Sequence, residues 1–225
     1  MKTVQTRAII LRRTNYGEAD RILQLLTPDG RRAVMARGVR REKSKLAGGI
    51  ELFAISDVVL GEGKGELGIL TSARLVHFYR HIIEDYDRLQ FGYLAVKLVA
   101  RASETVDEPE WYDLLSEIFM GLDSKTIDLD LIQAWFYIHY AALLGHDLNL
   151  DLDINGNKLR SDTQYRYDVG EQGLDERPGG EVTAEHIKLL RLISTKSLKI
   201  LAQIGGVEAI LPVCFTVARE HASVN

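Results

Sequence analysis

The segment ADRILQLLTPDGRRAVMARGV, residues 19–39, decides the first half of the fold. Its two aliphatic runs, Ala19–Thr27 and Arg31–Val39, have the composition of β-strands. Between them stands Pro28-Asp29-Gly30, a turn sequence, because proline fixes φ and glycine accepts positive φ. The segment therefore predicts two adjacent strands joined by a short turn.

Three more strand-like segments surround this pair, at Thr3–Thr14, Leu52–Leu60 and Glu66–Tyr79. The glycine-rich stretch at 61–65 separates the last two and predicts a hairpin loop. Five strands in about 80 residues, with no long helix between them, are typical of a small closed barrel. The OB-fold is the common five-stranded barrel, although the strand count also fits an SH3-like barrel.

The hydrophobic period changes from two to three or four residues after Glu84. We expect an irregular β-hairpin at about 147–181, where Asp, Asn and Gly interrupt the helical pattern. Thr183 can cap the helix that follows, but His186 stands where a reciprocal capping box needs Glu or Gln. The sequence predicts an α+β protein with an OB-fold domain at 1–80 and a helical domain at 81–225. The expected helices cover 84–108, Glu110–Leu122, Asp128–Leu144, Thr183–Ile193, Lys196–Ile204 and Val207–Glu220.

Charge is unevenly distributed along the 225 residues, whose formal net charge is −4. Residues 1–80 hold fifteen Lys and Arg against eight Asp and Glu, and the remainder holds thirteen against twenty-four. A basic half joined to an acidic half is typical of a polyanion-binding module fused to a second domain. The single cysteine excludes a disulfide framework, and no apolar run is long enough for a membrane span. We expect a soluble, cytoplasmic protein that does not enter a membrane.

The densest basic segment is residues 31–45, with seven cations and one acid. Arginines form bidentate hydrogen bonds with phosphates, and clustered cations gain affinity by releasing counterions from nucleic acid. A solvated charged loop that binds nothing is the alternative. Arg12, Arg13 and Tyr16 in the first hairpin extend the candidate surface, with Tyr16 able to stack on a base. The segment itself contributes Arg31, Arg32, Arg37, Arg40, Arg41, Lys43 and Lys45, of which those from Arg40 onward are expected on a mobile loop.

The other motifs give weaker evidence of a functional site. The glycines at 61–65 lack the Ser or Thr of a phosphate loop and join two strands instead of opening a helix. The acidic stretch Asp151–Asp162 resembles half of a calcium loop, but Asx turns explain the same residues. Cys214, His139 and His146 have no partner with which to form a catalytic site. We therefore expect no enzyme activity, no cofactor and no metal.

The barrel half resembles the bacterial recombination mediator family RecO. The resemblance rests on RTNYGEADR at 13–21, TPDG at 27–30, MARGVRREKSKL at 35–46 and ELF at 51–53, in this order and spacing. The helical half is similar more loosely, through the order of its helices and AALLG at 141–145. Many members carry a four-cysteine zinc site in the hairpin, which this chain lacks, so packing and Asx-type hydrogen bonds must hold that region.

The resemblance implies a protein that binds single- and double-stranded DNA through its OB-fold and anneals complementary strands. It also implies contacts with RecR and with the acidic C-terminal tail of the single-stranded DNA-binding protein, and help in loading RecA. For the acidic tail, Lys97, Arg101 and Lys188 are candidates without a motif. Two alternatives stay open: an RNA-binding OB-fold protein, and an adaptor whose barrel binds an acidic protein tail.

Overall fold

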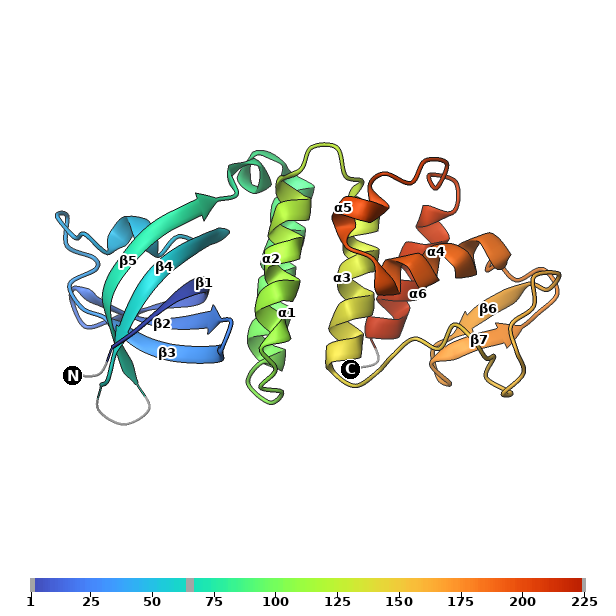
Figure 1. The fold of residues 1–225 in the computed structure, drawn as a ribbon, viewed down its shortest axis with the longest axis horizontal. Coiled ribbons are helices and arrows are strands. Elements are labelled where there is room, and N and C mark those ends of the chain that lie inside the picture. The colour runs from blue at the N-terminus through green and yellow to red at the C-terminus, as the bar shows by residue number, and fades with distance from the viewer. Residues whose placement is uncertain (1–2, 64–66, 224–225) are drawn as a thin grey trace. The chain divides into compact units, whose positions relative to one another are not determined.

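The computed structural model describes residues 3–63 and 67–223, and the chain divides after Asp123 into two compact units. The first unit contains five strands and two long helices, and the second contains helices and a short hairpin (Figure 1). The division predicted at 80/81 falls inside the first unit, between its strands and its helices, and stays a prediction for the boundary of the nucleic-acid-binding domain.

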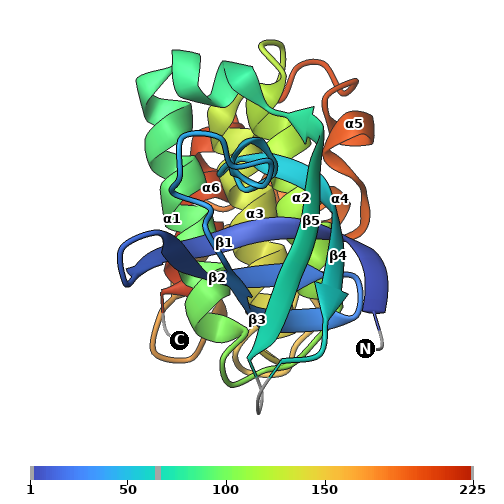
Figure 2. The same ribbon diagram turned by 90° about the vertical axis from the view of Figure 1, so that its left-hand side faces the viewer.

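The five strands close into a barrel in the order β1-β2-β3-β5-β4 (Figure 2). Neighbouring strands are antiparallel except β3 and β5, which run parallel over a short contact. This is the topology of an OB-fold, so the predicted fold class is confirmed. The loop predicted at 61–65 and the start of the strand predicted from Glu66 lie partly outside the described residues. The strands are β1 (Thr3–Tyr16), β2 (Asp20–Thr27), β3 (Gly30–Ala36), β4 (Ala54–Gly61) and β5 (Gly68–Phe78).

Alternating side chains fill the barrel, as the period of a β-strand requires. Ile10, Leu25 and Val34 are examples, each almost fully buried in the core. The turn between β2 and β3 forms as the sequence predicts: Gly30 has φ +97°, and the hydroxyl of Thr27 donates to the carbonyl of Gly30 at 2.8 Å. A β-bulge in β1 between Ile10 and residue 12 changes the register with β2.

Two helices, α1 (Tyr86–Ala102) and α2 (Glu110–Asp123), belong to the same unit as the barrel. Phe53, just before β4, packs edge-on against Tyr93 of α1 and Phe119 of α2, with ring centroids 5.0 and 5.6 Å apart. Its φ of 54° is unusual for a non-glycine residue. A side chain at Gly92 would come within 2.9 Å of the Phe53 ring, so α1 reaches this position only because residue 92 is glycine.

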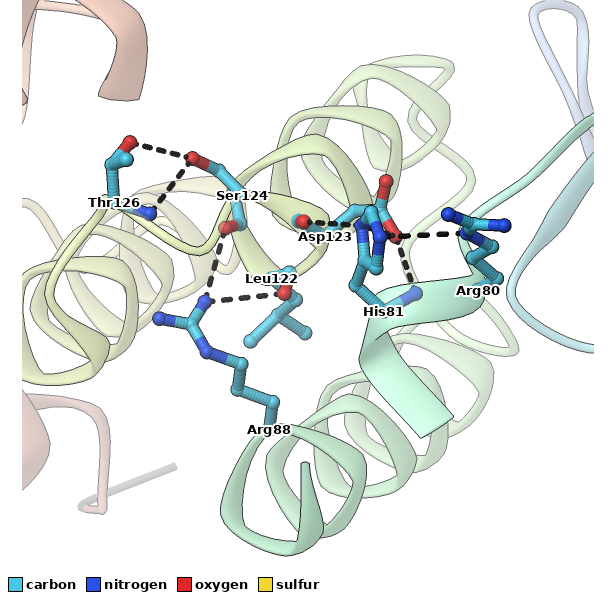
Figure 3. Close-up of polar contacts among 8 residues, drawn as sticks. Arg80, His81, Arg88, Leu122, Asp123, Ser124 and Thr126 are labelled. Carbon is cyan, nitrogen blue, oxygen red and sulfur yellow. Dashed lines mark hydrogen bonds and ion pairs between the residues drawn. The ribbon is translucent and has the colours of Figure 1, made fainter. Parts of the chain in front are cut away.

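The end of α2 is tied to α1 and to the segment before α1 (Figure 3). The backbone N–H of His81, in the short 3₁₀ helix Arg80–Glu84, donates to the carboxylate of Asp123 at 2.8 Å. Arg88 donates to the carbonyls of Gly121 and Leu122 at 3.3 and 3.1 Å, which satisfies acceptors that the helix end leaves free.

The second unit consists of helices with a short inserted hairpin, as predicted, and Asp128 caps its first helix by accepting from the N–H of Asp130 at 2.8 Å. No helix within residues 3–63 and 67–223 is long and apolar enough to cross a membrane. The elements are α3 (Leu129–Leu143), β6 (Tyr165–Asp168), β7 (Gly173–Glu176), α4 (Ala184–Thr195), α5 (Leu198–Leu201) and α6 (Leu211–Ala222).

Three buried or partly buried histidines connect the elements of the second unit. His139 on α3 lies 3.1 Å from the carbonyl of Ile193 on α4. His221 on α6 lies 2.8 Å from the hydroxyl of Tyr167 on β6. The prediction that no reciprocal capping box forms at Thr183 is wrong. The Nδ1 atom of His186 accepts from the N–H of Thr183 at 3.1 Å and completes the box. Desolvation lowers the pKa of all three imidazoles.

The contact between Gly92 and Phe53 gives a first prediction. Gly92→Val should lower the free energy of unfolding by about 1–3 kcal/mol, because the added methyl groups overpack the junction between barrel and helix. Urea unfolding measures it. Leu94→Val on the exposed side of the same helix is the control, with an expected change within about 0.5 kcal/mol. Equal midpoints for the two variants would contradict a tight junction.

The histidines give a second prediction. Below pH about 6.5 the unfolded chain takes up protons at these three sites more readily than the folded chain, so the stability of the second unit should fall as the pH falls. Urea unfolding at pH 7.5 and 5.5, followed by Trp135 fluorescence in a Trp111→Phe background, measures it. The reciprocal background, with Trp111 reporting on the first unit, is the control. A midpoint for Trp135 that does not move between the two pH values would contradict neutral, buried imidazoles.

Candidate nucleic-acid interface

The basic segment predicted from the sequence is divided between the two ends of strand β3. Arg31 and Arg32 lie where β3 begins, and the cations from Arg37 onward follow its end. Arg37 lies six residue steps along the extended chain from Arg31, which places them about 20 Å apart. The seven predicted cations therefore do not form one cluster.

The cations at the beginning of β3 already have protein partners. Arg31 forms an ion pair with Glu104 at 3.0 Å, and only 24% of its side chain is exposed. Arg32 donates to the carbonyls of Arg31 and Asp29 at 3.0 and 3.3 Å. A phosphate would have to compete with these contacts, so this end of β3 is less suited to binding than the sequence suggested.

The loop after β3 is a series of hydrogen-bonded turns. The carboxylate of Asp20 accepts from the N–H of Gly38 at 2.6 Å, and the N–H of Arg40 donates to the carbonyl of Ala19 at 2.9 Å. The Arg40 guanidinium donates to the carbonyl of Gly17 at 3.2 Å. These contacts tie Gly38 and Arg40 to the β1–β2 turn, and the mobility expected of the segment from Arg40 onward stays a prediction.

Five cations of this loop and one tyrosine form an exposed surface that we call the basic mouth. Tyr16 ends β1 directly before Gly17, and 55% of its surface is exposed. Within residues 3–63 and 67–223, no carboxylate forms an ion pair with the loop cations. In an OB-fold the β1–β2 loop is one of the usual oligonucleotide contacts. The basic mouth consists of Tyr16, Arg37, Arg40, Arg41, Lys43 and Lys45, all exposed.

The two remaining candidates, Arg12 and Arg13 on β1, lie in different surroundings. Arg13 donates hydrogen bonds to the carbonyl of Ile50 at 3.3 Å and to the carboxylate of Glu51 at 3.2 Å, and so holds the end of the loop. Arg12, paired with Gln24 across the strands, is exposed and lines a groove of about 420 Å³ beside α1.

Sequence reasoning did not find this groove. Lys97 and Arg101 line it, four residues apart on α1, and they were candidates only for binding an acidic tail. Their i, i+4 spacing shows that they share a helix face, but strand β1 opposite them comes from a distant part of the sequence. Lys188, the third such candidate, lies in the second unit and pairs with Glu185 at 2.8 Å.

The hairpin region holds its acidic residues by hydrogen bonds. Asp153 accepts from the N–H groups of Asn155 and Asn157 at 2.9 and 2.8 Å, which lowers the pKa of its carboxyl group. Asp162 is paired with Arg160 at 2.7 Å. These contacts account for the stretch that resembles a calcium loop. No cluster of three His, Cys, Asp or Glu suited to a metal occurs in the described part of the chain.

The family's zinc site does not fit this chain. A four-cysteine site needs four thiolates, and the sequence has only Cys214. That residue is buried in α6, where desolvation raises the pKa of its thiol to about 12. The hydrogen bonds of Asp153 hold the turn in this region instead.

Comparisons with known proteins agree with the architecture. The family model described as "Recombination protein O N terminal" matches residues 1–79, and "Recombination protein O C terminal" matches 83–213. A DNA repair protein RecO of Dehalococcoides mccartyi (strain ATCC BAA-2266 / KCTC 15142 / 195) is 32% identical over 203 residues, which cover 86% of this chain and 79% of that protein. The RecO protein of Roseiflexus sp. (strain RS-1) is 34% identical over 146 residues, 64% of this chain and 51% of that protein.

An OB-fold barrel followed by helices and a short hairpin, together with these matches, defines a DNA repair and recombination protein. The chain belongs to the RecO family. The resemblance seen in the sequence is thereby confirmed.

The contact between Asp20 and the loop gives a third prediction. Asp20→Ala should make the amide of Gly38 exchange its hydrogen about tenfold faster, because a charge-assisted hydrogen bond is lost. Hydrogen–deuterium exchange of a peptide covering 37–46 measures this. Asp20→Asn keeps an acceptor oxygen and should exchange at nearly the rate of the unmodified protein. Unchanged exchange in Asp20→Ala would show that the loop is held by something else.

Proposed function

We propose that this protein is a recombination mediator that binds single- and double-stranded DNA through the basic mouth and anneals complementary strands. With RecR it helps to load RecA onto DNA coated by the single-stranded DNA-binding protein, whose C-terminal tail it contacts. The observation that supports the DNA contact is the hydrogen-bonded loop after β3, which presents five cations free of carboxylate partners among the described residues. Family membership supports the role in repair.

The loop suits phosphates for two physical reasons. Its cations gain affinity by releasing counterions that nucleic acid condenses. The start of the loop is already held by Asp20, Ala19 and Gly17, so less conformational freedom is lost on binding than a disordered loop would lose. Tyr16 stands beside these cations and offers an exposed ring to an unpaired base.

A cationic surface of this kind suits a protein that binds DNA without making or breaking covalent bonds. Annealing needs two strands to be neutralised and brought together, which a cationic surface supplies without a nucleophile or a general base. We place this activity in the cytoplasm, where chromosomal DNA and the partner proteins of a bacterium are found. No cofactor or metal enters the proposal.

Charge reversal in the basic mouth gives the fourth prediction. With about four phosphates engaged, the affinity for labelled oligo-dT should fall with salt at a log–log slope near about −3. Arg40→Glu/Arg41→Glu should weaken binding at low salt by about tenfold or more, and flatten the slope by about 1.4. Fluorescence anisotropy across a salt series measures both quantities.

Two further variants sharpen this experiment. Because Arg40 also holds the loop, Arg41→Glu/Lys43→Glu tests the charges without removing that contact. Lys196→Glu/Lys199→Glu makes the same charge change in the second unit and should leave the slope unchanged. An unchanged slope in both mouth variants would move the DNA site elsewhere. Preference for RNA of matched sequence, or binding of an acidic peptide with no binding of oligonucleotides, would favour the alternative functions.

A further inference from the structure

A groove lies between strands β1 and β2 and helix α1 within the first unit, with a volume of about 420 Å³. Leu11, Leu52 and Val96 form an apolar part of its lining. Tyr93 stands in the same lining with 48% of its surface exposed, and its edge-on contact with Phe53 fixes the orientation of its ring. The groove therefore offers a rigid aromatic face beside an aliphatic surface.

Three cations surround this apolar lining. Arg12 comes from β1, and Lys97 and Arg101 come from successive turns of α1, about 6 Å apart along the helix axis. No carboxylate in the described ranges pairs with any of the three. Glu104 also lines the groove, but its charge is offset by the ion pair with Arg31. The groove thus carries an unbalanced positive charge.

One face of strand β1 leads from the groove to the basic mouth. Side chains of a strand alternate between its faces, so Arg12, Thr14 and Tyr16 share one face. Arg12 belongs to the groove and Tyr16 to the basic mouth, about 13 Å apart along the strand. A DNA single strand that runs from the basic mouth along β1 reaches the groove, and this face of β1 presents no acidic side chain between Tyr16 and Arg12.

We propose that the groove binds an unpaired nucleotide of single-stranded DNA, and that it gives the protein a preference for single strands over duplex. The base lies against Tyr93 and the aliphatic lining, and Arg12, Lys97 and Arg101 contact the flanking phosphates. This inference rests on the proposed function and adds a second contact, on α1, to the DNA surface of the barrel.

The chemistry of the groove favours an unpaired base over the other polyanions. A duplex can offer phosphates to the cations, but its bases are stacked and their faces are hidden. The volume is in the range of small-ligand pockets, which suits one nucleotide. An acidic peptide with an apolar side chain could also satisfy charge and lining, but it would gain nothing from a path to the basic mouth. The aromatic ring of Tyr93 and the path along β1 to the basic mouth favour single-stranded nucleic acid.

Two kinds of variant give the fifth prediction. Lys97→Glu/Arg101→Glu removes two phosphate contacts, so the affinity for oligo-dT should fall about tenfold and the salt slope should flatten by about 1.4. Ala100→Trp fills the groove without changing charge, so affinity should fall about tenfold with an unchanged slope. Ala100→Ser keeps the groove open and should bind as the unmodified protein does. Anisotropy is measured for labelled oligo-dT and for a duplex of equal length, with Lys196→Glu/Lys199→Glu as the charge control.

The outcomes separate this inference from the proposed function. A loss of single-strand binding in the groove variants that exceeds their loss of duplex binding supports it. Equal losses for single strand and duplex, or no loss for either, would overturn it while the DNA-binding function stands. A fluorescent Glu-Glu-Leu-Glu-Glu-Leu peptide provides the remaining arm: if only its binding is lost in Lys97→Glu/Arg101→Glu, the groove is a peptide site. Failure of the unmodified protein to bind any DNA would instead overturn the proposed function.

Discussion

The packing of Phe53 against α1 and α2 is the contact on which the rest of the first unit depends. Its ring meets Tyr93 and Phe119, and the missing side chain of Gly92 makes room for it. Packing of this buried ring offsets the strain of its positive φ. Because Leu52 and Tyr93 also line the groove beside α1, this contact sets both the position of the helix and the shape of the groove.

A second constraint acts on the charges. Arginines and lysines that stand close together repel one another, so a loop that gathers them needs contacts to hold it. Asp20 accepts from Gly38, and Val39 is buried in the barrel core, 3% exposed. The loop backbone is thus held at Gly38 and Val39 while its cationic side chains face outward. At the other end of β3 the protein does the opposite, since Glu104 neutralises Arg31. Local ion pairs therefore decide which of the clustered cations remain available to a phosphate.

The barrel could be predicted from sequence because its signals are local. Alternating aliphatic residues, the Thr27–Gly30 turn and the absence of a long helix between the segments define five strands without reference to distant contacts. The groove could not be predicted, because Arg12 and Lys97 are brought together only by the docking of α1 on β1. The division of the basic segment was missed because partners such as Glu104 are distant in sequence. The capping role of His186 was missed because imidazole replaces the usual carboxylate.

Hydrogen–deuterium exchange of the full chain, with and without saturating oligo-dT, tests the central claim most directly. The account predicts slower exchange in the β1–β2 turn and in residues 37–46, with added protection on α1 around Tyr93–Arg101. Protection of these segments would place single-stranded DNA on the basic mouth and the adjoining groove. Protection confined to the second unit, with the turn and the loop unchanged, would contradict the account.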